Sequence, residues 1–175
     1  MKALQELWDL AAELAQENEE TSMVFDSVGL CLQMPLVNYA YHCTPVNSST
    51  FATTRGDGVH FGLLHIDGEV IEKSPIIMTV PCNFGGEYNF VVGNDLHDFL
   101  CLGCRTGYFS LEDLVWEREE LINELKTPNA QSHKDARLLQ HLVTAFDLRP
   151  WNSFETKLEQ LKKKYLPLLQ LPPED

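Results

Sequence analysis

The first seventeen residues alternate apolar and acidic positions at helical spacing. Apolar side chains recur every three or four positions at Leu4, Leu7, Ala11 and Leu14, and glutamate or aspartate residues fall between them. This periodicity is typical of an amphipathic helix whose apolar stripe packs on the rest of the domain. We therefore predict a helix over residues 2–17.

A different pattern occupies residues 50–93, where short apolar runs are separated by turn-forming residues. The runs are TFATT, VHFGLLHI, PIIMTVP and NFVVG, and two Asp-Gly pairs, at Asp57 and Asp67, fall in this segment. Asp-Gly between apolar runs is a strong hairpin signal, so four antiparallel strands are expected here. Upstream, VGLCLQ is a candidate fifth strand, and Pro35 is expected to break the chain after it.

Residues 94–170 return to helical spacing. Asn94 is placed to cap a short helix that Gly103 ends, Ser110 with Asp113 resembles a capping box, and Asn152 precedes a last amphipathic stretch. The predicted helices cover residues 95–102, 111–126 and 132–146, and a fourth follows Asn152. The predicted fold is one α+β domain over residues 1–175, with an antiparallel sheet of four to six strands and helices packed on one face.

Composition restricts the functions to consider. The chain has 175 residues, 26 Asp and Glu against 13 Lys and Arg, and a net charge of −13. Nucleic acids and anionic membranes are bound by basic surfaces, so neither is an expected partner. The excess of acidic over basic residues is largest in residues 1–26, which hold seven acids and one base.

The N-terminus and the cysteines indicate the compartment. Acidic residues interrupt the first apolar positions, so no signal-peptide pattern is present, and no stretch reaches the roughly 20 apolar residues of a spanning helix. We therefore expect a cytoplasmic protein. Its five cysteines are then expected to be free thiols, mostly buried in the core.

The C-x-x-C pair Cys101 and Cys104 is the sharpest chemical motif. A redox pair needs its first thiol at a helix N-terminus, where the dipole favours the thiolate, but this pair falls at the end of a predicted helix. His97 could add a third zinc ligand, although the sequence has no second C-x-x-C. Packing in the core is the favoured interpretation, and a metal- or thiol-dependent protein using His97, Cys101 and Cys104 is the alternative.

No other residue group predicts catalysis. Asp57 and His60 could form an acid–base pair, but no nucleophile motif accompanies them. The three tryptophans, Trp8, Trp116 and Trp151, lie on or beside predicted helices and are expected to be core anchors. We expect no reaction, no metal and no cofactor.

The order GDGVHFGLL, PIIMTVP and NFVVGNDLHDFLCLGCRTGYFSLEDL resembles the SUKH superfamily, which groups bacterial immunity proteins with fungal regulators of cell-wall glucan synthesis. The resemblance covers about residues 50–115. It is carried by Asp57-Gly58, by Val91-Val92, and by the short helix with Leu96, Phe99, Leu100 and Gly103. It implies an α+β domain that lacks a cofactor and a reaction and that binds and neutralises a toxin.

Many such toxins are basic nucleases, which suits a chain of net charge −13. The resulting hypothesis is a non-enzymatic protein-binding domain with a protein partner, and a regulatory scaffold is a further alternative. The partner-binding residues we predict are acids on loops beside the sheet: Asp57, Asp67, Glu69, Glu72 and Glu87.

Overall fold

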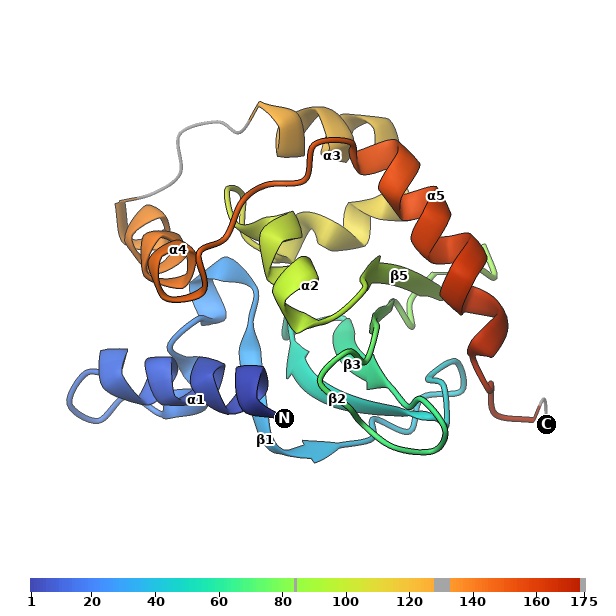
Figure 1. Ribbon diagram of the computed structural model, residues 1–175, viewed down its shortest axis with the longest axis horizontal. Coiled ribbons are helices and arrows are strands. Elements are labelled where there is room, and N and C mark those ends of the chain that lie inside the picture. The colour runs from blue at the N-terminus through green and yellow to red at the C-terminus, as the bar shows by residue number, and fades with distance from the viewer. Residues whose placement is uncertain (84, 128–132, 174–175) are drawn as a thin grey trace.

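A computed structural model describes residues 1–83, 85–127 and 133–173 (Figure 1). Five antiparallel strands form one sheet in the order β1-β2-β3-β4-β5, a simple meander. The strands are β1 (Cys31–Val37), β2 (Ser48–Thr53), β3 (His60–Leu64), β4 (Ile76–Thr79) and β5 (Asn89–Gly93). The predicted α+β fold with an antiparallel sheet is confirmed.

The α-helices are α1 (Lys2–Leu14), α2 (Leu96–Gly103), α3 (Arg118–Lys126), α4 (His133–Phe146) and α5 (Phe154–Tyr165). Four short 3₁₀ helices join them: η1 (Thr21–Met23), η2 (Asp26–Val28), η3 (Phe109–Leu114) and η4 (Leu166–Leu168). In Figure 1, α2, α3 and α4 lie above the sheet, and α5 runs beside β5. Within the described ranges, no helix is both long and apolar enough to cross a bilayer.

The Asp67-Gly68 pair forms a turn in the connection between β3 and β4. Asp67 and Gly68 both have positive φ, 52° and 85°, and the flanking residues Ile66 and Glu69 form an antiparallel bridge. Two consecutive positive φ values match the twist of antiparallel strands, and Asp followed by Gly adopts them at low cost. The predicted turn at Asp67 is therefore confirmed.

The candidate fifth strand is present as β1, an edge strand over Cys31–Val37 that begins within VGLCLQ, so the sheet starts before residue 50. The prediction that Pro35 breaks this strand was wrong, since β1 runs through it. Its pairing with β2 shifts register between Leu32 and Val37. Proline is tolerated at an edge strand and at such irregularities, because the missing N–H leaves no ladder bond unmade.

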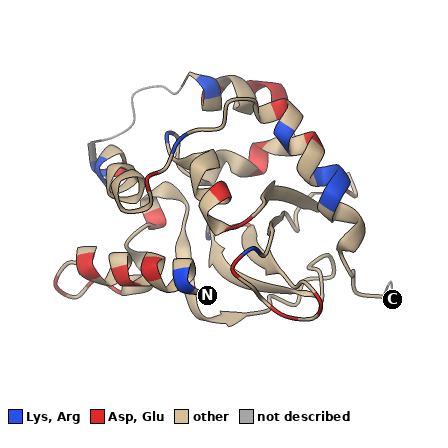
Figure 2. Cartoon of the chain, in the orientation of Figure 1, with Lys and Arg blue, Asp and Glu red and all other residues tan. Residues whose placement is uncertain are grey.

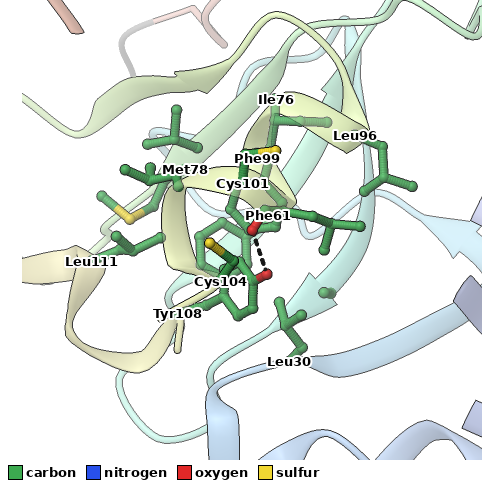
Figure 3. Packing of buried hydrophobic residues seen from close by; sticks show 14 of the residues in the cluster. Leu30, Phe61, Ile76, Met78, Leu96, Phe99, Cys101, Cys104, Tyr108 and Leu111 are labelled. Atoms are coloured by element: carbon green, nitrogen blue, oxygen red, sulfur yellow. Dashed lines mark hydrogen bonds between the residues drawn. The ribbon is translucent and has the colours of Figure 1, made fainter. Parts of the chain in front are cut away.

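Helix α2 anchors the core on the sheet (Figure 3). The Phe99 ring lies with its centroid 4.8 Å from that of Phe61 and 5.0 Å from that of Tyr108. Tyr108 is fully buried, and its hydroxyl donates to the Leu100 carbonyl at 2.8 Å. A Cβ on Gly103 would lie only 2.5 Å from the Tyr108 ring, so the helix needs glycine there.

Two predicted helix ends differ from the structure. The N-terminal helix stops at Leu14 and not at residue 17, because the chain turns at Asn18, whose φ is 68°, and the Glu19 carboxylate accepts the Gln16 N–H. At α2 the cap is Asp95 and not Asn94, since the Asp95 side chain accepts the Asp98 N–H at 2.8 Å. The predicted position was one residue too early.

The predicted helix over residues 111–126 is two helices, η3 and α3. Leu111 and Leu114 are both buried, and their spacing of three matches a 3₁₀ helix, in which residues three apart share a face. The chain then changes direction at Glu117, the N-cap residue of α3, and a second helix begins. The next helix agrees with its prediction from His133 onward, and residue 132 lies outside the described residues.

Residues 38–47 pack against the first residues of β3 and β5. The Asn89 side chain donates to the Cys43 carbonyl at 2.9 Å, and the Thr44 hydroxyl lies 3.2 Å from His60 Nε2. The rings of Tyr39 and Tyr41 lie 5.5 and 5.7 Å from the His60 ring. This loop therefore helps to bury His60 and Asn89, which are 2% and 7% exposed.

Candidate functional site: a carboxylate surface at one end of the sheet

The cysteine motif lies in the core. Cys101 and Cys104 are 7% and 5% exposed. Burial raises the pKa of both thiols, that of Cys104 to about 11, so both are protonated at neutral pH. A protonated thiol is a poor nucleophile and a poor metal ligand.

His97, the third residue of the possible zinc site, has structural partners for both of its ring nitrogens. Its Nδ1 lies 3.8 Å from the Cys101 sulfur, and its Nε2 lies 3.0 Å from the Phe146 carbonyl. A carbonyl only accepts, so Nε2 carries the proton. Among the described residues, no three His, Cys, Asp or Glu side chains come together in a way that could hold a metal ion. His97 and Cys101 therefore link α2 to the end of α4.

Both ring nitrogens of His60 also contact neighbouring residues of the fold. Its Nδ1 donates to the Gly58 carbonyl at 2.7 Å, and its Nε2 faces the Thr44 hydroxyl. Burial lowers its pKa, so the ring is neutral at physiological pH. Both ring nitrogens are engaged by partners other than Asp57, and the acid–base pair considered from the sequence does not form.

The five predicted acids fall at two opposite ends of the sheet. Asp57 lies between β2 and β3 and Glu87 between β4 and β5, whereas Asp67, Glu69 and Glu72 lie between β3 and β4. Alternate connections of a meander lie at opposite ends, and a five-residue strand separates them by roughly 17 Å. The five acids therefore do not form one surface.

Two of these acids have structural partners. Both carboxylate oxygens of Glu72 accept backbone N–H groups at the start of α1, from Lys2 and Ala3, each at 2.8 Å. Glu87 forms an ion pair with Lys162 of α5. These contacts join the sheet connections to helices at the two ends of the chain.

Asp57 belongs to an acidic and aromatic group that the sequence did not reveal. The pKa of Glu112 is raised by its partial burial and by the nearby charges of Asp113 and Asp57, which places both aspartates within electrostatic reach of Glu112. Phe109 and Trp116 precede and follow Glu112 and Asp113 in the sequence and are 56% and 53% exposed. We call these five residues the carboxylate surface.

The backbone at Phe109 is fixed by its contact with η2. The Tyr108 N–H donates to the Val28 carbonyl at 2.7 Å, and a Cβ on Gly29 would lie 2.3 Å from the Phe109 nitrogen. Gly29 also has a φ of 84°, which strongly favours glycine. The exposed Phe109 ring is thus presented from a rigid backbone.

The prediction that Trp116 is a core anchor was wrong, although Trp151, which is 7% exposed, is one. The sequence signal that could have located this surface is the segment FSLEDLVWE, in which Leu111 and Leu114 take the buried positions. If those leucines are buried on a 3₁₀ helix, Phe109 and Glu112, three residues apart, share another face.

Acidic side chains are also distributed along α1, whereas lysines gather on the C-terminal half of α5 (Figure 2). The molecule therefore has regions of opposite charge despite its net charge of −13.

No protein-family model, curated protein sequence or solved structure matches this chain. The fold and the side-chain geometry define it as an α+β domain built on a five-stranded antiparallel meander.

Proposed function

We propose that this chain is a non-enzymatic protein-binding domain and that the carboxylate surface binds a basic protein. The observation that carries the proposal is that Glu112, whose pKa is raised by partial burial and by the charges of Asp113 and Asp57, lies on a segment that also exposes the rings of Phe109 and Trp116. Aromatic side chains are enriched in interface hot spots, and large exposed apolar groups among polar ones often mark binding sites.

The charge of the surface selects the partner. Like charges held together are unfavourable in the free protein, and a cationic partner relieves that repulsion. Arginine suits this surface best, because it can pair with a carboxylate and stack on an aromatic ring. The partner is therefore expected to present arginine or lysine side chains to Asp57, Glu112 and Asp113.

A toxin of the basic nuclease type is the partner that best combines this chemistry with the resemblance to the SUKH superfamily. The net charge of −13 also supports it, since long-range attraction raises association rates by about 10- to 1,000-fold. In this role the domain would act by occupying the toxin's cationic surface, with no chemical step of its own.

The test isolates a partner by affinity capture on the immobilised chain at low salt and then measures association rates by biolayer interferometry. The variant is the triple substitution Asp57→Asn, Glu112→Gln and Asp113→Asn. The matched control removes three exposed charges elsewhere, at Glu13, Glu17 and Glu20.

We expect the first triple variant to lower the association rate by about tenfold and the control by about twofold or less, because steering weakens beyond a Debye length of roughly 8–10 Å. Raising the salt concentration should reduce the difference. Equal rates for the two triple variants would show that only the net charge matters, and failure to retain any protein would refute the proposal.

A further inference from the structure

A second group of aromatic side chains lies next to Asp57, in the segment of residues 38–47. The ring centroids of Tyr39 and Tyr41 are 6.5 Å apart, and they lie 5.5 and 5.7 Å from the centroid of the His60 ring. The planes of Tyr41 and His60 differ by only 20°, so these two rings stack. Three aromatic rings therefore pack together around a segment that contains no Asp, Glu, Lys or Arg.

Tyr41 is placed beside Asp57 by the glycine that follows this acid. A Cβ on Gly58 would lie only 2.6 Å from the Tyr41 hydroxyl oxygen, so the tyrosine lies directly on the backbone at Gly58. Adjacent Cα atoms are about 3.8 Å apart, which puts the Tyr41 hydroxyl within roughly 8 Å of the Asp57 Cα. The aromatic ring and the carboxylate are thus close enough for one arginine side chain to contact both.

The Tyr41 ring is available to a cation from outside the chain. Its side chain is 40% exposed, so part of the ring is open to solvent. The neighbouring His60 ring is neutral at physiological pH, because burial lowers its pKa, and it does not repel a cation. Among the described residues, the rings that have a lysine ammonium over them are those of Trp151 and Tyr165, and not that of Tyr41.

The carboxylates next to this ring also lack a cationic partner. None of Asp57, Glu112 and Asp113 forms an ion pair with another residue that the structure describes. The base nearest to Asp57 in the sequence, Arg55, pairs instead with Asp26 at 3.5 Å. A cation that reaches this surface therefore meets unpaired carboxylates and an exposed aromatic ring side by side.

We propose that Tyr39 and Tyr41 extend the carboxylate surface and make it select arginine over lysine. This inference rests on the proposed function, because it assigns the side chain that the basic partner presents. A guanidinium is planar, so it can stack on an aromatic ring while its N–H groups donate to a carboxylate. An ammonium is a compact, strongly hydrated charge that gains less from the ring. Tyr41 is the specificity-determining residue, and Asp57 is the carboxylate beside it.

The experiment titrates the full chain with two peptides of equal charge, acetyl-tetra-arginine amide and acetyl-tetra-lysine amide. Binding is followed by ¹H–¹⁵N chemical shifts at low and constant ionic strength. We expect the wild type to bind the arginine peptide about threefold more tightly, because a cation–π contact at an exposed site changes affinity by about two- to fivefold. The shifts should include residues 39–41 and 57–58. Equal Kd values for the two peptides would overturn the inference.

Substitutions of Tyr41 test whether the aromatic ring causes the preference. Tyr41→Leu removes the ring, Tyr41→Phe keeps it without the hydroxyl, and the matched control Tyr165→Leu makes the same change at the opposite end of the sheet, near Asn94. We expect Tyr41→Leu to bind the two peptides with similar Kd values, whereas Tyr41→Phe and Tyr165→Leu should keep the preference for arginine. An undiminished preference in Tyr41→Leu would overturn the inference. The comparison of the two peptides on the wild type does not depend on the folding of any variant.

The triple variant of Asp57, Glu112 and Asp113 separates this inference from the function on which it rests. If the triple variant weakens the binding of both peptides while Tyr41→Leu keeps the preference for arginine, the inference fails and the protein-binding proposal stands. If the triple variant binds both peptides as tightly as the wild type, the carboxylate surface does not attract cations, and both fail. Weaker binding in the triple variant together with a lost preference in Tyr41→Leu is the result that we expect.

Discussion

Substitution of Glu72 by glutamine separates a structural role from a binding role. In the structure its two carboxylate oxygens accept the N–H groups of Lys2 and Ala3, so a side chain from the β3–β4 connection caps a helix about seventy residues earlier in the chain. The first N–H groups of a helix have no partner within the helix, and a carboxylate there also interacts favourably with the helix dipole. Glutamine keeps the shape but has one acceptor oxygen in place of two.

The expected magnitude follows from this geometry. Capping interactions contribute about 0.5–2 kcal/mol, and the exposure of Glu72 places it in the lower part of that range, at about 1 kcal/mol. For a chain of this size, such a loss lowers Tm by about 2–4 °C. The matched control is Glu69→Gln, which removes an equal charge from the same connection, and it should leave Tm nearly unchanged.

The pH dependence gives a second test. The N–H groups of Ala3 and Lys2 hold the pKa of Glu72 below its ordinary value, so the stabilisation is present above the pKa of the unfolded chain, about 4.3, and is lost as pH falls through the lower folded value. Urea unfolding at pH 7 should therefore separate the wild type from Glu72→Gln, and the difference should shrink as the pH falls below the pKa of the unfolded chain. A pH-independent difference, or one matched by Glu69→Gln, would refute the capping argument.

Three further predictions concern the core, the thiols and the exposed aromatic side chains. Gly103→Ala should destabilise the fold by about 1–3 kcal/mol in chemical unfolding, because the added Cβ meets the Tyr108 ring at 2.5 Å; an effect within 0.5 kcal/mol would contradict this packing. Cys82 is the exposed cysteine, so a thiol reagent should label the native chain rapidly at one equivalent, and Cys82→Ser should abolish that phase; a second fast equivalent would contradict the burial of the other four. Trp116→Ala should change the free energy of unfolding by about 0.5 kcal/mol or less yet accelerate dissociation of a captured partner; a large loss of stability would instead indicate a core role.

The strands were predictable because their signals are local. The apolar runs around Phe61 and Ile77 are separated by turn residues, and a turn depends only on the backbone preferences of about four consecutive residues. Short connections then place each strand beside the next one in the chain, which gives the meander. Pro35 shows the limit of that reasoning. Whether a proline is tolerated depends on its position at the edge of the sheet, which is a property of the whole fold.

The site was less accessible to prediction, because its geometry depends on contacts between distant segments. The sequence marks Glu72 as an acid on a loop, but only the placement of α1 makes it a cap. Glu112 and Asp57 are 55 residues apart, and their proximity arises from the packing of η3 near the β2–β3 connection.

The charged side chains of α5 contribute little to where the helix lies. Among the residues that the structure describes, four ion pairs join α5 to other elements: Arg118–Glu159, Lys126–Glu155, Lys157–Asp98 and Lys162–Glu87. Most of their members are substantially exposed, and such pairs contribute about 0–1 kcal/mol each.

The apolar face of α5 has the larger effect on its position. Phe154, Leu158 and Leu161 are buried, and full burial of such side chains contributes about 1.5–3 kcal/mol each. Helix docking is therefore dominated by these three residues, so Lys163 and Lys164 can be exchanged without displacing the backbone.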